Sequence, residues 1–248
     1  MDIAGPSPWW EQRLWCAGAA GAVVAALLAL RAVVAARGTT ALPAALWAVA
    51  ASAIIAIDLG LRATGFVGQP AAAAAIRLLG TVLSVSPALS LLGAKRPQHG
   101  VWQFIVAALA AVVLLPSAGG ALVRPGSVPD VHLLARLLLT GLLALGWMNA
   151  LGTGRALSVS VMTLGVVVLA RGFLPGVDTE TSFPPASGAA THRAALVDCI
   201  GAWVVAVGAI VGASRRRNGR EAGPAEGTFS ARVDPAWKAL RDTVGAAW

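Results

Sequence analysis

Charge is what this sequence has least of. Only 12% of its 248 residues are charged, whereas soluble domains carry roughly 25%. Its 19 basic and 11 acidic side chains are too few to cover the core of a water-soluble protein of this length. The sequence is also 57% hydrophobic, and its Ala, Leu and Val residues fall in long runs. Both features indicate a polytopic membrane protein, whose length allows at most about seven or eight spans of roughly 20 residues.

Residues that carry chemistry are also scarce. Two cysteines and three histidines leave little room for a disulfide framework or a metal site. The two lysines, Lys95 and Lys238, lie outside the apolar runs, which excludes a retinal Schiff base inside the bundle. The metalloprotease pattern HExxH, the hydrolase pattern GxSxG and the phosphate loop GxxxxGKS/T do not occur. We therefore expect neither an enzyme nor a bound cofactor.

Seven apolar segments are long enough to cross a bilayer, and they predict an all-α transmembrane bundle. They cover residues 14–36, 41–60, 74–94, 101–122, 131–151, 156–174 and 194–213. Residues 1–213 therefore form the predicted transmembrane domain, and residues 214–248 a basic tail. The third segment is the least regular, since it carries Arg77 near one end and Pro87 in its interior. It is either a full span or a re-entrant segment.

The basic residues predict the orientation. The net charge is +8, but these residues lie at the ends of the apolar runs and in the tail, which argues against nucleic-acid binding. With seven spans, twelve of them fall on the side of the C-terminus and seven on the other side. Positive charge favours the cytoplasmic side of a membrane. We therefore expect a multi-pass protein of the bacterial inner membrane, with its N-terminus outside and its C-terminus inside.

The tail carries a second membrane-binding signal. Asp234 and Pro235 fit the start of a helix, which is preceded by a flexible linker at residues 219–230. Trp237 and Trp248 then share one face of this helix with two aliphatic residues. The pattern predicts a short amphipathic helix near residues 235–248, bound to anionic lipid of the inner leaflet. The alternative is a disordered tail.

Ionisable residues inside the spans are the default place to look for function. Under the predicted topology they gather in the outer third of the bundle: Asp58, Arg77, His132, Arg136, Arg171 and Asp198. They suggest either a polar pocket that is open to the outside and able to hold an anion, or a set of internal ion pairs and outward-reaching arginines. Asp198 needs a cationic partner because it lies about one turn inside its span. Depth favours Arg136 or Arg171, followed by Arg77.

Two of these residues have neighbours at helical spacing. His132 and Arg136 are four residues apart and so share one helix face, and Asp58 has the same spacing to Arg62. We expect Asp58 and Arg62 to pair with each other.

The stretch GAKRPQHGVWQFIV, residues 93–106, is the most distinctive of the chain. It places Lys95, Arg96, His99 and Trp102 in one tight cytoplasmic turn. The stretch resembles a block in uncharacterised integral membrane proteins of planctomycete-type bacteria. The resemblance covers the third and fourth spans and implies no activity. The turn is either an ordinary positive-inside connection with an interfacial Trp or a docking surface for a partner or anionic lipid.

Small residues and cysteines mark the last span. Gly201, Gly208 and Gly212 lie on one side of it, which predicts close packing against another helix. Cys16 and Cys199 both map to outer span ends, where they either form a disulfide or pack as small apolar residues.

Two functions remain compatible with the sequence. The favoured one is a non-catalytic accessory or scaffold component of the membrane, which acts through a membrane-protein partner of unknown identity. The alternative is a small-solute transporter or channel that uses the outer polar pocket. A transporter is expected to show an internal repeat or helices broken at the midplane, and neither is evident in the sequence.

Overall fold

The computed structural model describes residues 9–64, 70–93, 99–123, 131–151, 155–176 and 188–221. Within these ranges the chain is helical and contains no strand. Seven helices are long and apolar enough to span a membrane, which confirms the predicted all-α bundle. The chain is a multi-pass membrane protein. The helices are α1 (Trp9–Ala35), α2 (Leu42–Ala63), α3 (Pro70–Gly93), α4 (His99–Val123), α5 (Leu133–Leu151), α6 (Ala156–Ala170) with the short 3-10 helix η1 (Arg171–Phe173), and α8 (Gly188–Glu221).

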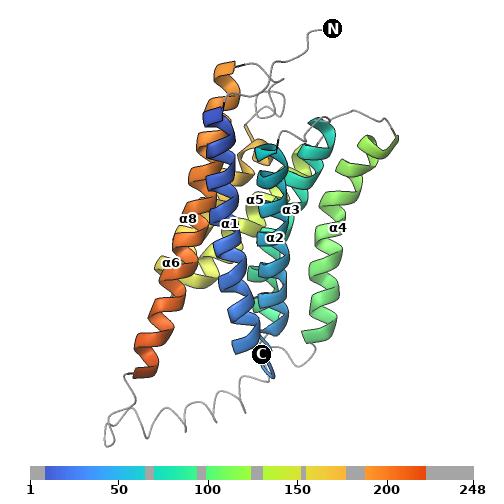
Figure 1. Cartoon of the computed structure of the whole chain (residues 1–248). Helices are drawn as coiled ribbons and strands as arrows, with labels where there is room; N and C mark the ends of the chain where they lie inside the picture. The colour runs from blue at the N-terminus through green and yellow to red at the C-terminus, as the bar shows by residue number, and fades with distance from the viewer. Residues whose placement is uncertain are drawn as a thin grey trace, which may run out of the picture.

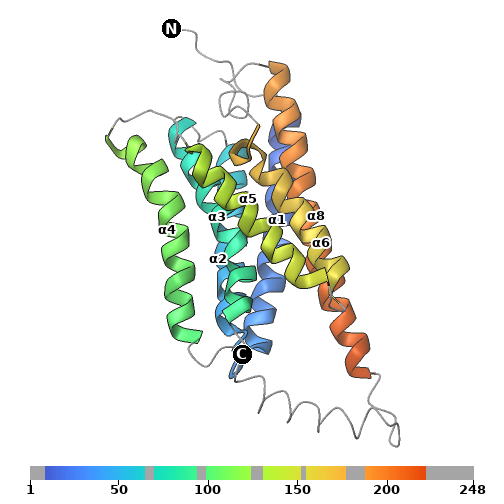
Figure 2. The ribbon, with the colours of Figure 1, turned by 180° about the vertical axis from the view of Figure 1, so that it is seen from behind.

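The helices pack side by side, and α1 lies between α2 and α8 (Figure 1). On the other side of the bundle α6 packs along α8, and α5 follows beside α6 and α3 (Figure 2). Helix α4 stands at the edge, where it packs mainly on α3 and barely touches α5. Helices α1 and α8 begin at the same end of the bundle. We call this the outer end, because the charge distribution predicts that it faces the outside.

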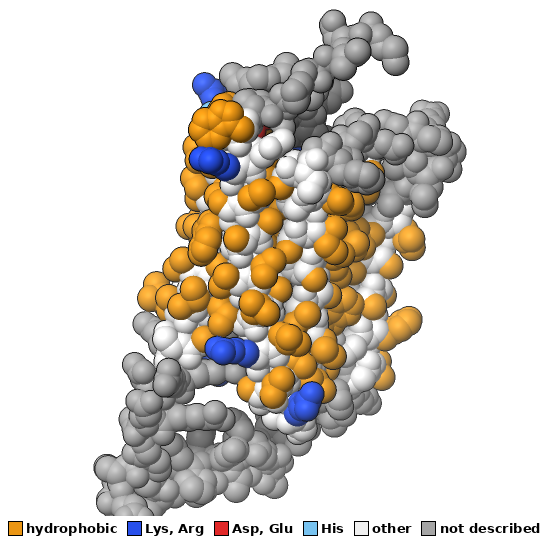
Figure 3. All heavy atoms as spheres, viewed as in Figure 1, with side chains coloured by type: hydrophobic (Ala, Val, Ile, Leu, Met, Phe, Trp, Pro, Cys, Tyr) orange, Lys and Arg blue, Asp and Glu red, His pale blue; other side chains and the backbone are white. Residues whose placement is uncertain are grey.

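The surface is apolar where a lipid-facing surface is expected. Figure 3 shows hydrophobic side chains over the middle of one face and Lys or Arg side chains toward its two ends. Phe104 and Leu115 on α4 are 74% and 70% exposed. Leu134 on α5 is 69% exposed. Such exposure would be costly in water, but in a bilayer these side chains meet acyl chains of similar polarity.

Helix α3 is the most deeply packed span. Half of its apolar window is buried, against 22% for α1 and for α2. It runs as one helix from Pro70 to Gly93, with Pro87 inside it, so the segment crosses the bundle and is not re-entrant. Leu78 and Val82 on α3 pack in one core with Val106 and Val113 of α4. The buried position of α3 matters for function because it carries Arg77 into the interior.

Helices α6 and α8 approach each other through glycines. A Cβ added at Gly165 of α6 would lie 2.7 Å from the backbone nitrogen of Val205. One added at Gly208 of α8 would lie 2.8 Å from the backbone nitrogen of Met162. The Ser158 hydroxyl donates a hydrogen bond of 2.7 Å to the Gly208 carbonyl across this contact. The predicted small-residue packing face is therefore confirmed, and α6 is its partner.

The last helix is longer than the apolar segment that predicted it. The segment covered residues 194–213, whereas α8 begins at Gly188 and continues through Glu221. Residues 215–217, three arginines, therefore lie on the last turns of a helix. The prediction that a linker starts at residue 219 is wrong, because the helix continues to Glu221. The predicted amphipathic helix at 235–248 lies outside the described residues.

Candidate functional site: a charge cluster at the outer end

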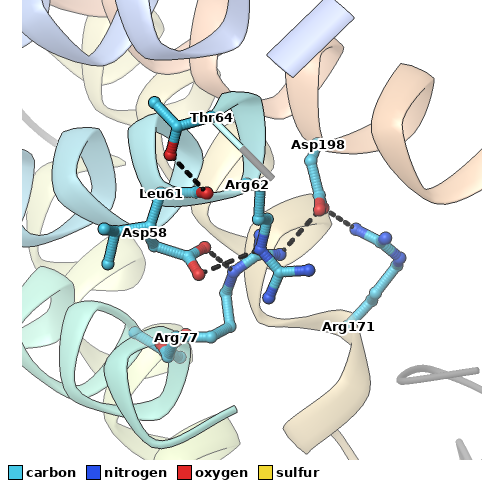
Figure 4. A network of polar contacts seen from close by, with 8 residues as sticks. Asp58, Leu61, Arg62, Thr64, Arg77, Arg171 and Asp198 are labelled. Carbon is cyan, nitrogen blue, oxygen red and sulfur yellow. Dashed lines mark hydrogen bonds and ion pairs between the residues drawn. The ribbon is translucent and has the colours of Figure 1, made fainter. Parts of the chain in front are cut away.

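Five charged side chains from four separate parts of the chain meet near the outer end of the bundle (Figure 4). Asp58 and Arg62 lie in the last turns of α2, and Arg77 lies in the early part of α3. Arg171 opens η1 at the end of α6, and Asp198 lies in the early part of α8. Consecutive spans run in opposite directions, so the ends of α2 and α6 and the starts of α3 and α8, the seventh span, lie at a similar depth. We call these five residues the outer cluster.

Arg77 is the centre of the outer cluster. Its Nε donates to Asp58 Oδ2 at 2.5 Å, and its Nη1 lies 2.9 Å from Asp198 Oδ2. Arg77, Asp58 and Asp198 retain only 7%, 3% and 1% of their surface exposed. One guanidinium therefore joins α2 to α8 through the interior, from a helix that lies between them in sequence. A planar guanidinium suits this position because its nitrogens can serve two carboxylates at once.

Two further arginines bind the other oxygens of the same aspartates. Arg62 Nε donates to Asp58 Oδ1 at 3.0 Å, one helical turn away. Arg171 Nη1 donates to Asp198 Oδ1 and also to the Val168 carbonyl, the latter at 3.0 Å. These two arginine side chains are more accessible than Arg77, with 18% exposed for Arg62 and 28% for Arg171. The outer cluster thus has a buried centre and a partly open edge.

Pairing is what makes these charges tolerable at this depth. An Asp or Arg at the centre of a transmembrane helix costs about 2.5–3.5 kcal/mol on insertion scales. Each of the four carboxylate oxygens of Asp58 and Asp198 faces an arginine nitrogen. Arg62 also lies over the ring of Trp15 on α1, with its Cζ 5.3 Å from the ring centroid. The outer cluster therefore links α1, α2, α3, η1 and α8 through polar contacts.

The structure confirms part of the predicted pairing. Asp198 is paired with Arg171, one of its two favoured partners, and Asp58 is paired with Arg62. The sequence ranked Arg77 third for Asp198, yet Arg77 binds both aspartates. Depth along the span was readable from the sequence, but the neighbours of each helix were not. The only local signal was the four-residue spacing of Asp58 and Arg62.

His132 and Arg136 lie apart from the outer cluster, at the start of α5. His132 is exposed, and its Nδ1 accepts a hydrogen bond of 3.3 Å from the Leu134 backbone N–H. Arg136 Nε donates to the Val131 carbonyl at 2.8 Å. His132 thus caps an N–H group of the first turn of α5, which has no intrahelical partner, and Arg136 binds the carbonyl of a residue just before the helix. Four of the six predicted pocket residues therefore come together, and these two do not join them.

The aromatic residue of the predicted docking turn contacts the interior. Trp102 Nε1 donates to the Leu89 carbonyl of α3 at 2.6 Å. Next to it, the Gln103 side-chain oxygen accepts from Trp47 Nε1 and from the Ser90 hydroxyl, both at 3.0 Å. These bonds join α2, α3 and α4 near the end opposite the outer cluster. Trp102 therefore has a packing role in addition to any interfacial one.

The rest of the predicted contact surface is not described by the structure. His99 begins α4, but its side chain lies outside the described residues. Four further residues lie wholly outside the described ranges, namely Lys95, Arg96, Trp237 and Trp248.

The remaining ligand-type residues form no further site in the described ranges. Cys16 and Cys199 are free thiols, so the disulfide alternative is not realised, and the Cα of Cys199 packs close to Gly18. Among the described residues no three His, Cys, Asp or Glu side chains are grouped in a way that could hold a metal ion.

A comparison of the chain with protein-family models, curated proteins and solved structures finds no match.

Proposed function

We propose that this protein is a non-catalytic accessory or scaffold component of the bacterial inner membrane. The observation that carries the proposal is the outer cluster. Its two carboxylates, the strongest candidates for a proton carrier or a substrate ligand, are both occupied by arginines of the same chain. Such an arrangement fixes helices relative to one another, which is what a scaffold requires.

The path of the helices supports the same proposal. Transporters commonly bind their substrate near the midplane, between helices that are broken there. Here α3 continues through Pro87 and α4 continues through Pro116 as single helices. The charged residues also gather near one end of the bundle, away from the midplane. Both features favour a rigid bundle over a transporter that works by alternating access.

Co-purification tests this proposal most directly. The full chain is extracted in a mild detergent from its native membrane, and the eluate is analysed by quantitative mass spectrometry. A scaffold predicts a membrane-protein partner in stoichiometric amount. The control is the Asp198→Asn variant, which disturbs the outer cluster and is expected to reduce the amount of partner that is recovered.

The alternative function makes the opposite prediction. If the chain purifies without a stoichiometric partner and, in liposomes, increases the flux of small anions over that of protein-free vesicles, the scaffold proposal is wrong. A small-solute transporter or channel that uses the outer end then replaces it.

A further inference from the structure

The outer cluster has more positive than negative charge. Three arginines, Arg62, Arg77 and Arg171, form ion pairs with only two aspartates, Asp58 and Asp198. The ion pairs within the outer cluster thus leave one positive charge without a counter-charge from it.

Two nitrogen atoms point to where this charge lies. The Nη2 atoms of Arg62 and Arg77 are both buried, and neither has a hydrogen-bond partner in the described part of the chain. Figure 4 shows the two guanidinium groups lying together between Asp58 and Asp198, with Arg171 reaching Asp198 from the other side. Adjacent guanidinium groups repel each other, and a buried N–H group without a partner is costly. One additional hydrogen-bond acceptor that carries a negative charge would relieve both effects.

We propose that Arg62 and Arg77 form a binding site for a single anionic group, a carboxylate or a phosphate, with Arg171 at its edge. Guanidinium groups bind both anions through paired, charge-assisted hydrogen bonds. A water molecule satisfies the two Nη2 donors equally well, but it leaves the excess charge in place. The site is independent of the scaffold function, since it rests only on the charges and donors of the outer cluster.

The two arginines differ in the number of aspartates that hold them and in their exposure. Arg77 is held by two aspartates in the interior, whereas Arg62 is held by one and is partly exposed. We therefore expect Arg62 to move when the anion enters and Arg77 to stay in place. Two sources supply this chemistry at the outer end of the bundle, namely the phosphate of a lipid headgroup and a free anion from outside.

The test uses the full chain, purified in an uncharged detergent. Its melting temperature is measured in sodium chloride, sodium acetate and sodium phosphate at equal ionic strength. Native mass spectrometry with added phosphatidylglycerol provides the lipid arm. A ligand that binds only the folded state is expected to raise the melting temperature by about 5–10 °C when its concentration is about 100 times its dissociation constant.

Two variants separate the site from general salt effects. Phosphate stabilises many proteins by being excluded from their surface, and this effect acts equally on every variant. Arg62→Gln is expected to lose the additional shift and the bound lipid. Arg13→Gln, a change of the same type at an exposed outer position, is expected to retain both. If Arg62→Gln does not fold, Arg62→Lys keeps the charge without the planar fork and is expected to bind about tenfold more weakly.

Each result decides something. A shift with acetate or phosphate that depends on Arg62 supports the site with a free anion as ligand. Bound phosphatidylglycerol that depends on Arg62, without a shift from the free anions, supports the site with a lipid headgroup as ligand. The proposal is overturned if neither is seen, or if Arg62→Gln responds as strongly as the unchanged chain.

Discussion

Replacing Asp198 with Asn tests whether the outer cluster holds the bundle together. The substitution preserves the size of the side chain and removes its negative charge. In the folded protein Asp198 is 1% exposed and binds Arg77 and Arg171 through its two oxygens. After the change, three arginines face Asp58 alone. The folded state must then hold more uncompensated positive charge in a region of low dielectric constant.

The size of the effect follows from which arginine bears the cost. Arg171 keeps its bond to the Val168 carbonyl, and with 28% of its side chain exposed it can turn toward water. Arg77 is 7% exposed and has no such route. Removing one partner from a buried ion pair typically costs about 3–5 kcal/mol. For a chain of this length each kcal/mol lowers the melting temperature by about 2–4 °C, so we expect a decrease of roughly 10 °C.

The assay is thermal unfolding of the purified chain in mild detergent and a chloride buffer, with a double-mutant cycle. Adding Arg77→Gln to Asp198→Asn removes the arginine that bears the cost, leaves Asp58 paired with Arg62, and should restore part of the loss, about 0.5–3 kcal/mol. Adding Arg31→Gln, at an exposed position near the other end of α1, should restore nothing. An Asp198→Asn variant that melts like the unchanged chain would refute the reasoning, and so would equal restoration by both arginine changes.

Two further predictions concern other parts of the chain. Gly165→Ala should lower stability by about 1–3 kcal/mol, because the new Cβ would lie 2.7 Å from the Val205 backbone nitrogen, whereas Gly141→Ala, with nothing within 4 Å, should be neutral or slightly stabilising. Equal melting temperatures for the two variants would contradict the close α6–α8 contact. A synthetic peptide of residues 232–248 should become helical on anionic vesicles and dissociate as salt is raised. A peptide that stays unstructured there would rule out the interfacial helix.

The sequence predicts some of these features well because they depend on local patterns. The seven spans follow from the length of apolar runs, and the pairing of Asp58 with Arg62 follows from a four-residue spacing on one helix. The small-residue face of α8 was visible as glycines on one side of a helix, although its partner α6 was not. All three patterns are complete within a single segment of the chain.

The ion pairs between different helices depend on which helices are neighbours, and the hydropathy of the sequence carries no such information. Arg77 and Asp198 are far apart in sequence and meet because α3 packs between α2 and α6, near the start of α8. Arg136 lies at a similar predicted depth, but it belongs to α5, which packs on α3 and α6, and its Nε donates to the Val131 carbonyl. The early start of α8 was missed because residues 188–193, GAATHR, are too polar to extend an apolar run.

The orientation of the seven spans decides which side of the membrane the outer cluster, the tail and the proposed anion site face. It is measured with paired topology reporters, one fused after Trp248 and one inserted within residues 179–187, between η1 and α8. The split of twelve basic residues to seven predicts a cytoplasmic signal from the first reporter and a periplasmic signal from the second. Signals from the same side would contradict the seven-span topology, and a reversed pair would place the outer cluster on the cytoplasmic side.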